Sequence, residues 1–403
     1  MGYVEDGIVL WPLCPNWKKP ITETLEFRTR VIGPTLTGVR QKRRMRKAPR
    51  RYMNFEVHPH HASRRFVDNL RFAQGKRAWA MPIWHDRQSL AASLIAGATS
   101  IPCATEGFDF AAGRYAVLRP NVIFSDQFEI VEVESVEADS ITLAGATAQD
   151  WPAGTFLYPI RMARLADNSN NSILLSDEVS TLQVSFEMSE VCDWPTAEFA
   201  STYLGAPVWE FSNNWASSRN FAFNRVLDTL DNDVALPLYY DFSDKTFAAL
   251  DASWMVKGRT AHSIMRSALY TLAGRYLTLW VPTLANDLEI AGTMASGASV
   301  LPVKACGYSL FGLGMHGRRD IRIELAGGVV YYRRITDSEE SDGVEELTLN
   351  APLGVEVSPT NVRRISFMML MQQASDNLTI THHTDADGVT TAPLVFEGVT
   401  ETS

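Results

Sequence analysis

The sequence of 403 residues predicts a mainly β (α+β) protein made of two tandem copies of one unit. Three observations predict this fold class. The two halves of the chain resemble each other, each half carries one amphipathic helical segment, and each half continues into short segments that alternate between apolar and polar residues. Each unit is expected to contain a β-sandwich or barrel-like sheet, one helix and a small inserted β-domain.

The similarity between the halves has a period of about 200 residues, because Pro82 recurs as Pro282 and Pro102 as Pro302. Further matched pairs are Trp11 with Trp209, Trp17 with Trp215, and residues 180–188 with residues 376–384. The first unit is therefore expected over residues 1–195, with its small β-domain near 88–160. The second, diverged copy is expected over residues 205–395, with its small β-domain near 286–365.

One amphipathic helix is expected in each unit, and each is followed by a strand that runs into a proline. Residues 62–75 place Phe66, Val67, Leu70 and Ala73 on one helical face and end at Gly75, a residue type that favours helix ends. The second copy repeats this pattern with Ile264, Ala268, Leu269, Leu272 and Gly274. After the proline, alternating segments such as RYAVLRP and DIRIELAG are separated by Gly, Pro, Asn and Asp, as in antiparallel β-structure.

Composition and motifs argue against several functional classes. The charged fraction of 21% and the hydrophobic fraction of 46% are typical of a globular chain. Neither a signal peptide nor a membrane span is expected, because no basic residue precedes the first short apolar run and no apolar stretch approaches about 18 residues. The sequence lacks nucleotide-binding, zinc-hydrolase and serine-hydrolase motifs. We therefore expect no enzyme activity, no cofactor and no metal ion.

Cysteines, histidines and an acidic stretch are also expected to be structural. Cys14, Cys103, Cys192 and Cys306 lie far apart, which favours free core thiols in a reducing compartment. His58, His60 and His61 are expected at the surface, and His382 and His383 on an exposed edge strand, because adjacent residues of a strand point to opposite faces. The acidic residues 337–346 fail the calcium-loop pattern, since Leu349 stands where a carboxylate is needed, and predict a solvated hairpin.

The strongest charge anomaly is the segment 40–51, which holds eight basic residues and no acid. They are Arg40, Lys42, Arg43, Arg44, Arg46, Lys47, Arg50 and Arg51. The whole chain has a formal charge of -9, so the remainder without these eight is at -17. A nucleic-acid patch is one interpretation, but the run lacks aromatic residues for base stacking. We favour a subunit interface in which these side chains contact an acidic neighbouring copy.

The first unit resembles a known family over about residues 22–86. The order TETLEFRTRV, then TGVRQKRRMRKAPRRYMNFEV, then an amphipathic helix ending in GKRAWAMPIWHD is similar to the distal-tail and minor-tail proteins of siphophages and gene transfer agents. The matching positions are Thr22, Glu23, Gly38, Arg43, Arg44, Arg50, Arg51, Tyr52, Gly75 and Trp79. The second copy keeps the tryptophans, the helix and the strand before the proline but lacks the basic run.

The resemblance implies a structural virion protein at the tail tip, made in the host cytoplasm, that forms a ring between tail tube and baseplate hub. Its implied partners are further copies of itself, the tail tube protein, the hub protein and the tape-measure protein. From the duplication we expect a trimer with pseudo-six-fold symmetry, with a hexamer as the competitor. Two alternatives stay open: a carbohydrate-binding or carbohydrate-cleaving β-protein that uses the ten tryptophans for stacking, and a nucleic-acid-binding protein.

Overall fold

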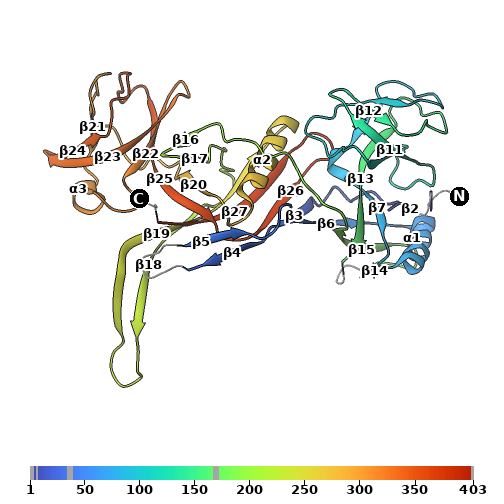
Figure 1. The fold of residues 1–403 in the computed structure, drawn as a ribbon, viewed down its shortest axis with the longest axis horizontal. Helices are drawn as coiled ribbons and strands as arrows, with labels where there is room; N and C mark the ends of the chain where they lie inside the picture. The colour runs from blue at the N-terminus through green and yellow to red at the C-terminus, as the bar shows by residue number, and fades with distance from the viewer. Residues whose placement is uncertain (1–3, 6–7, 34–39, 167–171, 401–403) are drawn as a thin grey trace.

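The computed structural model describes residues 4–5, 8–33, 40–166 and 172–400 (Figure 1). The chain is mainly β, with 47% strand and 9% helix, which confirms the predicted fold class. The molecule is elongated: a central sheet carries the small β-domains at its two ends, and a long two-stranded arm projects from one side. Among the described residues, 21 strands join into one connected system of β-pairings.

The elements of the first half in chain order are β1 (Val4–Glu5), β2 (Ile8–Val9), β3 (Ile21–Glu26), β4 (Thr29–Ile32), β5 (Gln41–Arg44), β6 (Arg50–Val57), α1 (His61–Gln74), β7 (Trp79–Pro82), the 3-10 helix η1 (Trp84–Asp86), β8 (Gln88–Ser89), β9 (Ser100–Pro102), β10 (Arg114–Arg119), β11 (Glu129–Val136), β12 (Ser140–Leu143), β13 (Phe156–Leu165), β14 (Ser172–Leu174) and β15 (Ser180–Met188).

Those of the second half are β16 (Thr202–Tyr203), β17 (Ala206–Pro207), β18 (Asn220–Leu230), β19 (Leu238–Val256), α2 (Arg259–Leu272), β20 (Thr278–Pro282), β21 (Val300–Lys304), α3 (Tyr308–Phe311), β22 (Asp320–Leu325), β23 (Val330–Ser341), β24 (Val344–Leu349), β25 (Val362–Gln373), β26 (Asn377–His382) and β27 (Thr390–Gly398).

The central sheet crosses from one half of the chain to the other. Strand β3 pairs antiparallel with β6 of its own half on one side and with β26 of the second half on the other. The sheet continues through β27 and β19 in one direction and through β15 in the other. The residues of β3 alternate between buried and half-buried, which places Ile21, Glu23 and Leu25 on the buried face. A carboxylate is therefore buried in the middle of this sheet.

The strand pairings of the first half recur in the second half. In the first half β13 pairs with β7, β10 and β15, and β10 leads through β11 and β12 to β9. In the second half β25 pairs with β20, β22 and β27, and β22 leads through β23 and β24 to β21. By this order β15 corresponds to β27 and β14 to β26. The sequence comparison matched residues 180–188, which form β15, with residues 376–384, which include β26. That match is wrong, because the pairing order makes β15 equivalent to the next strand, β27.

Both predicted helices are present, but the faces that they bury differ from the expectation. In α1, Val67 is buried, whereas Ala73 is exposed, and the helix ends at Gly75 with a φ of 53°. Helix α2 packs at the centre of the molecule (Figure 1) and buries most of its residues, although Ile264 is exposed. It is followed by Gly274, where a Cβ atom would lie only 2.5 Å from the carboxylate of Asp376, so no larger residue fits without a shift.

Two smaller predictions concern the acidic stretch and the cysteines. The acidic residues form the predicted hairpin between β23 and β24, and its turn residues Asp342 and Gly343 both have positive φ angles, as tight hairpin turns require. All four cysteines are free. The expectation of core thiols is wrong for Cys306, which is exposed, because it precedes the short surface helix α3.

Candidate functional site

The basic segment lies mainly on a hairpin at the surface, the basic hairpin, formed by β4 and β5 (Figure 1). Arg43 and Arg44 of β5 and the following Lys47 are exposed. Arg44 donates to the backbone oxygens of Arg46 and Lys47, which stabilises the turn after β5. Within the described part of the chain, no acidic side chain pairs with Arg43, so this face of the hairpin is left with uncompensated positive charge.

Other members of the segment attach the basic hairpin to the rest of the same chain. Arg40 pairs with Glu397 of β27 at 2.5 Å, and the Lys42 ammonium donates to Thr278 at 2.8 Å. Burial and the nearby Arg40 lower the pKa of Lys42 to about 8. Arg46 pairs with Glu26 at 3.0 Å. These contacts lie within one chain, so Arg40, Lys42 and Arg46 depart from the predicted contact with a neighbouring copy.

Arg51 also departs from the predicted interface, because it is buried inside the chain. Residues alternate sides along β6, so Arg50 points to solvent while Arg51 points into the core with Met53. Its guanidinium forms ion pairs with Glu23, at 2.5 Å, and with Asp109. A continuous basic run in the sequence therefore divides into a solvent face and one buried cation.

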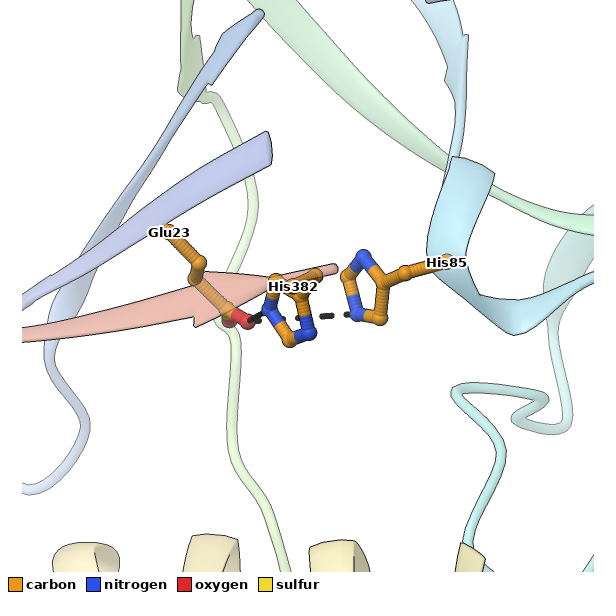
Figure 2. A group of neighbouring side chains, drawn as sticks. All are labelled: Glu23, His85 and His382. Carbon is orange, nitrogen blue, oxygen red and sulfur yellow. Dashed lines mark hydrogen bonds and ion pairs between the residues drawn. The ribbon is translucent and has the colours of Figure 1, made fainter. Parts of the chain in front are cut away.

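Glu23 is the centre of a buried polar cluster, the central junction, where the two halves of the chain meet. Its carboxylate pairs with Arg51 of β6 and, at 2.9 Å, with Arg266 of α2. It also pairs with the His382 ring of β26 at 2.9 Å, as Figure 2 shows. Burial alone would raise the pKa of Glu23, but Arg266 and Arg51 offset it and hold the pKa well below its usual range. Glu23 is thus a buried carboxylate anion that joins both halves.

A second set of ion pairs extends the central junction toward the first small β-domain. Asp109 pairs with Arg51 and, at 2.5 Å, with Arg161. Asp86 pairs with Arg259 of α2 at 2.5 Å and accepts the backbone N–H of Asp109 at 2.9 Å. Arg259 also donates to the backbone oxygens of residues 85 and 107. Helix α2 is therefore bound to the first half through two arginines, Arg259 and Arg266, that lie about two turns apart.

Three buried histidines line the same junction, and His382 contradicts the expectation of an exposed edge. Strand β26 lies between β3 and β27, so His382 is buried, whereas His383 is exposed. The His85 ring stacks on His382 with centroids 3.6 Å apart, and His262 approaches edge-on at 5.4 Å. Burial lowers the pKa of all three rings below the usual histidine range. Neutral imidazoles thus fill the space beside Glu23. His58, His60 and His61 are exposed, as expected.

A metal ion is one possible occupant of this cluster, since ligand atoms of Glu23, His85 and His382 lie within 4.8 Å of one another. The arrangement does not fit a divalent cation. The Glu23 carboxylate is already shared by two arginines and one histidine, and the two rings lie parallel instead of converging on one point (Figure 2). A cation would add charge next to Arg51 and Arg266. We assign the central junction a structural role.

A cleft of about 750 Å³ opens beside the junction, between the first small β-domain, residues 193–196 and α2. Phe108 and Trp194 line it. Each ring already carries a guanidinium on one face, from Arg259 at 3.8 Å and from Arg266 at 4.3 Å. These aromatic rings therefore serve the ion pairs of the junction.

The sequence reasoning missed two features, the central junction and the arm. The arm comprises residues 221–248, where β18 and β19 pair with each other and extend beyond the strand β27 that supports their base (Figure 1). Its sequence signal is the turn segment DNDVALP, flanked by apolar and aromatic residues on both strands. The signal for the junction is Glu23 itself, since it stands on the apolar face of an alternating strand.

Searches against protein-family models and against curated proteins found no match for this chain. Within the described residues, none of the helices has the length and apolar character that crossing a bilayer requires.

Proposed function

We propose that the chain is a structural virion component of a phage tail tip, a ring-forming distal-tail protein that joins the tail tube to the baseplate hub and has no catalytic role. The proposal combines the resemblance of residues 22–86 to distal-tail proteins with the surface of the folded chain. The mainly β architecture and the ion-paired junction that makes one body of the two halves support it.

The arm is the observation that carries the proposal. From residue 249, where β19 leaves β27, the two strands run on by about 35 Å. Near their base Phe223 and Phe247 contact Arg318 and His316, and most of the described residues farther out are exposed. Large apolar side chains are exposed along it: Phe223, Leu227, Leu230, Val234, Leu236, Leu238, Tyr239 and Tyr240. A lone two-stranded ribbon is marginally stable in water, and exposed apolar surface of this kind marks contact sites. This arm is suited to a chain that works inside an assembly.

We also infer that the chain is a tandem duplication. The same order of strand pairing in both halves supports it, as does a matched bond near each start: the backbone N–H of Trp11 donates to residue 80, and that of Trp209 to residue 280. The basic hairpin and the arm stand at equivalent points of the two units. The basic hairpin connects β3 to β6, and the arm connects the corresponding strands β18 and β19. The copies have thus diverged most in these two projections.

The carbohydrate alternative receives less support from the distribution of aromatic residues. Most tryptophans are buried, namely Trp11, Trp79, Trp84, Trp151, Trp209, Trp254 and Trp280. Trp215 is exposed, but it is stacked by Arg219 at 5.3 Å. The carbohydrate alternative predicts exposed aromatic rings gathered in one cleft. Most tryptophans of this chain therefore belong to its cores.

The proposed function predicts a closed ring of defined mass. We expect the purified chain of 44.9 kDa to form a species of about 135 kDa if three copies close the ring, or about 270 kDa if six copies do. Native mass spectrometry and averaged end-on electron micrographs distinguish the two, and antibody labelling should place the ring at the tail tip. A chain that stays monomeric with tail tubes present contradicts the proposal.

The tip of the arm is expected to serve tail assembly instead of folding. Val234→Ser with Leu236→Ser changes two side chains that are 88% and 90% exposed, so the melting temperature should stay within about 1 °C. Incorporation into tails should fall more than tenfold, because the apolar contact area is lost. Ile95→Ser, at a position 74% exposed on the first small β-domain, is the matched control and should assemble normally. Equal incorporation of both variants would argue against a role for the arm.

A further inference from the structure

The central sheet ends in two strands that have one partner each. Its order is β18, β19, β27, β26, β3, β6, β15 and β14. Among the described residues, β14 pairs only with β15, and β18 pairs only with β19. Each of these outer strands presents unpaired backbone N–H and C=O groups to one side. An edge of this kind is a template for another strand.

The internal joint between β26 and β3 shows how such edges fit together. The recurrent pairing order makes β14 of the first half equivalent to β26 of the second half. It likewise makes β18 of the second half equivalent to β3 of the first half. We propose that β14 of one copy pairs antiparallel with β18 of the next copy and so repeats the internal joint between chains. The proposal rests on the ring-forming part of the proposed function and names the surface that closes the ring.

The register of this joint follows from the equivalent positions. Aligning Pro82 with Pro282 makes Thr181 of β15 equivalent to Thr391 of β27. Ile173 lies opposite Thr181, and Thr381 lies opposite Thr391. Ile173 is therefore equivalent to Thr381. The same alignment places Asn220 where Thr22 stands. Thr381 lies directly opposite Thr22 in the internal joint. Ile173 is therefore expected opposite Asn220 of the next copy.

Exposed apolar residues occupy the positions that the internal joint buries. Leu174 is equivalent to the buried His382, but its side chain is 63% exposed. Phe221 is equivalent to the fully buried Glu23, but its side chain is 36% exposed. Pairing with another copy would bury both side chains. The internal joint is held by ion pairs, whereas this one would be held by apolar contact, the usual driving force for association.

Helix α1 supplies an independent indication. In the second half, Tyr270 of α2 reaches across the internal joint and packs edge-on against Phe27, with ring centroids 5.9 Å apart. Phe72 lies as many residues from the start of α1 as Tyr270 lies from the start of α2, so the two positions are equivalent. Phe72 is 94% exposed in the single chain. A neighbouring copy on β14 gives this aromatic ring a surface to pack against.

The proposed joint also fixes how the units follow one another around the ring. Internal joints and joints between copies would alternate around the ring, so each chain contributes two similar units. A trimer, as expected from the duplication, would then have six units with pseudo-six-fold symmetry.

Disulfide trapping tests the register directly. We would place Ile173→Cys and Asn220→Cys in the full chain, with Cys306→Ser to remove the exposed native thiol. Directly opposed strand residues have Cα atoms about 4.5 to 5.5 Å apart, within the range of a disulfide. Mild oxidation should give covalent dimers and trimers on non-reducing gels, in at least tenfold excess over either single-cysteine chain.

The matched control is Ile173→Cys with Phe221→Cys, which shifts the register by one residue and turns the second thiol to the other face. It should link at least tenfold less. A second variant, Leu174→Asp, changes a side chain that is exposed in the single chain, so it should fold normally and sediment as a monomer. A wild-type monomer, equal linking of both cysteine pairs, or an intact ring with Leu174→Asp would overturn the proposed joint. Linked rings that never bind tail tubes would instead contradict the tail function alone.

Discussion

Glu23→Gln is expected to lower the free energy of unfolding by about 3 to 5 kcal/mol, the usual cost of removing one charge from a buried ion pair. The substitution keeps the shape of the side chain, so packing is almost unchanged. It leaves the guanidinium groups of Arg51 and Arg266 buried without their shared anion. Denaturation by urea, followed by tryptophan fluorescence, measures the change.

Glu26→Gln is the matched control for this prediction. Glu26 lies on the same strand β3, but its side chain is partly exposed and pairs with Arg46 at the surface. Surface pairs of this kind contribute at most about 1 kcal/mol. Equal losses for the two variants would show that Glu23 does not join the halves as an anion.

Acidification below pH 6.5 is expected to destabilise the chain steeply. His85, His262 and His382 have pKa values lowered by burial, so an unfolded chain binds protons that the folded chain does not. Stability is therefore complete above about pH 6.5 and falls as the pH drops from there toward the lowered values, by up to about 1.4 kcal/mol per pH unit for each histidine. Below about pH 4.5, the lowered pKa of Glu23 adds a further loss in the same direction.

The contribution of one histidine can be isolated with His262→Phe. Neither ring nitrogen of His262 has a hydrogen-bond partner, so a ring that cannot be protonated fits the same site and should reduce the slope by about a third. His383→Gln changes an exposed neighbour of the cluster and should leave the slope as it is. The charged groups around these rings are Glu23, Asp86, Arg51, Arg259 and Arg266. A wild-type curve that stays flat down to pH 4.5 would contradict the prediction.

Local sequence patterns were sufficient for the fold class and for single elements. Period-two alternation indicated strands such as β3, and the helical periodicity before Gly75 indicated α1. The acidic hairpin followed from a glycine turn between alternating segments. All of these depend on interactions between residues near in sequence, which the sequence displays directly.

The central junction depends on residues far apart in sequence, so composition alone could not reveal it. Glu23 and His382 are separated by 359 positions, and their contact exists only because β3 and β26 are neighbours in the sheet. Arg51 shows a different limit. A basic run suggests one surface, but strand alternation places adjacent arginines on opposite faces. Applying alternation within the run would have separated Arg51 from Arg50.

The pairing of β3 with β26 has a consequence for synthesis on the ribosome. Strand β3 emerges roughly tens of seconds before β26, since about 350 residues must still be translated at 5 to 20 residues per second. During this interval β3 is an open edge, and nascent chains on one message lie close together. An inward-pointing charge is a known device against edge-to-edge aggregation, and Glu23 is such a charge. The residue that later joins the two halves therefore also protects the unfinished chain until its own partner strand arrives.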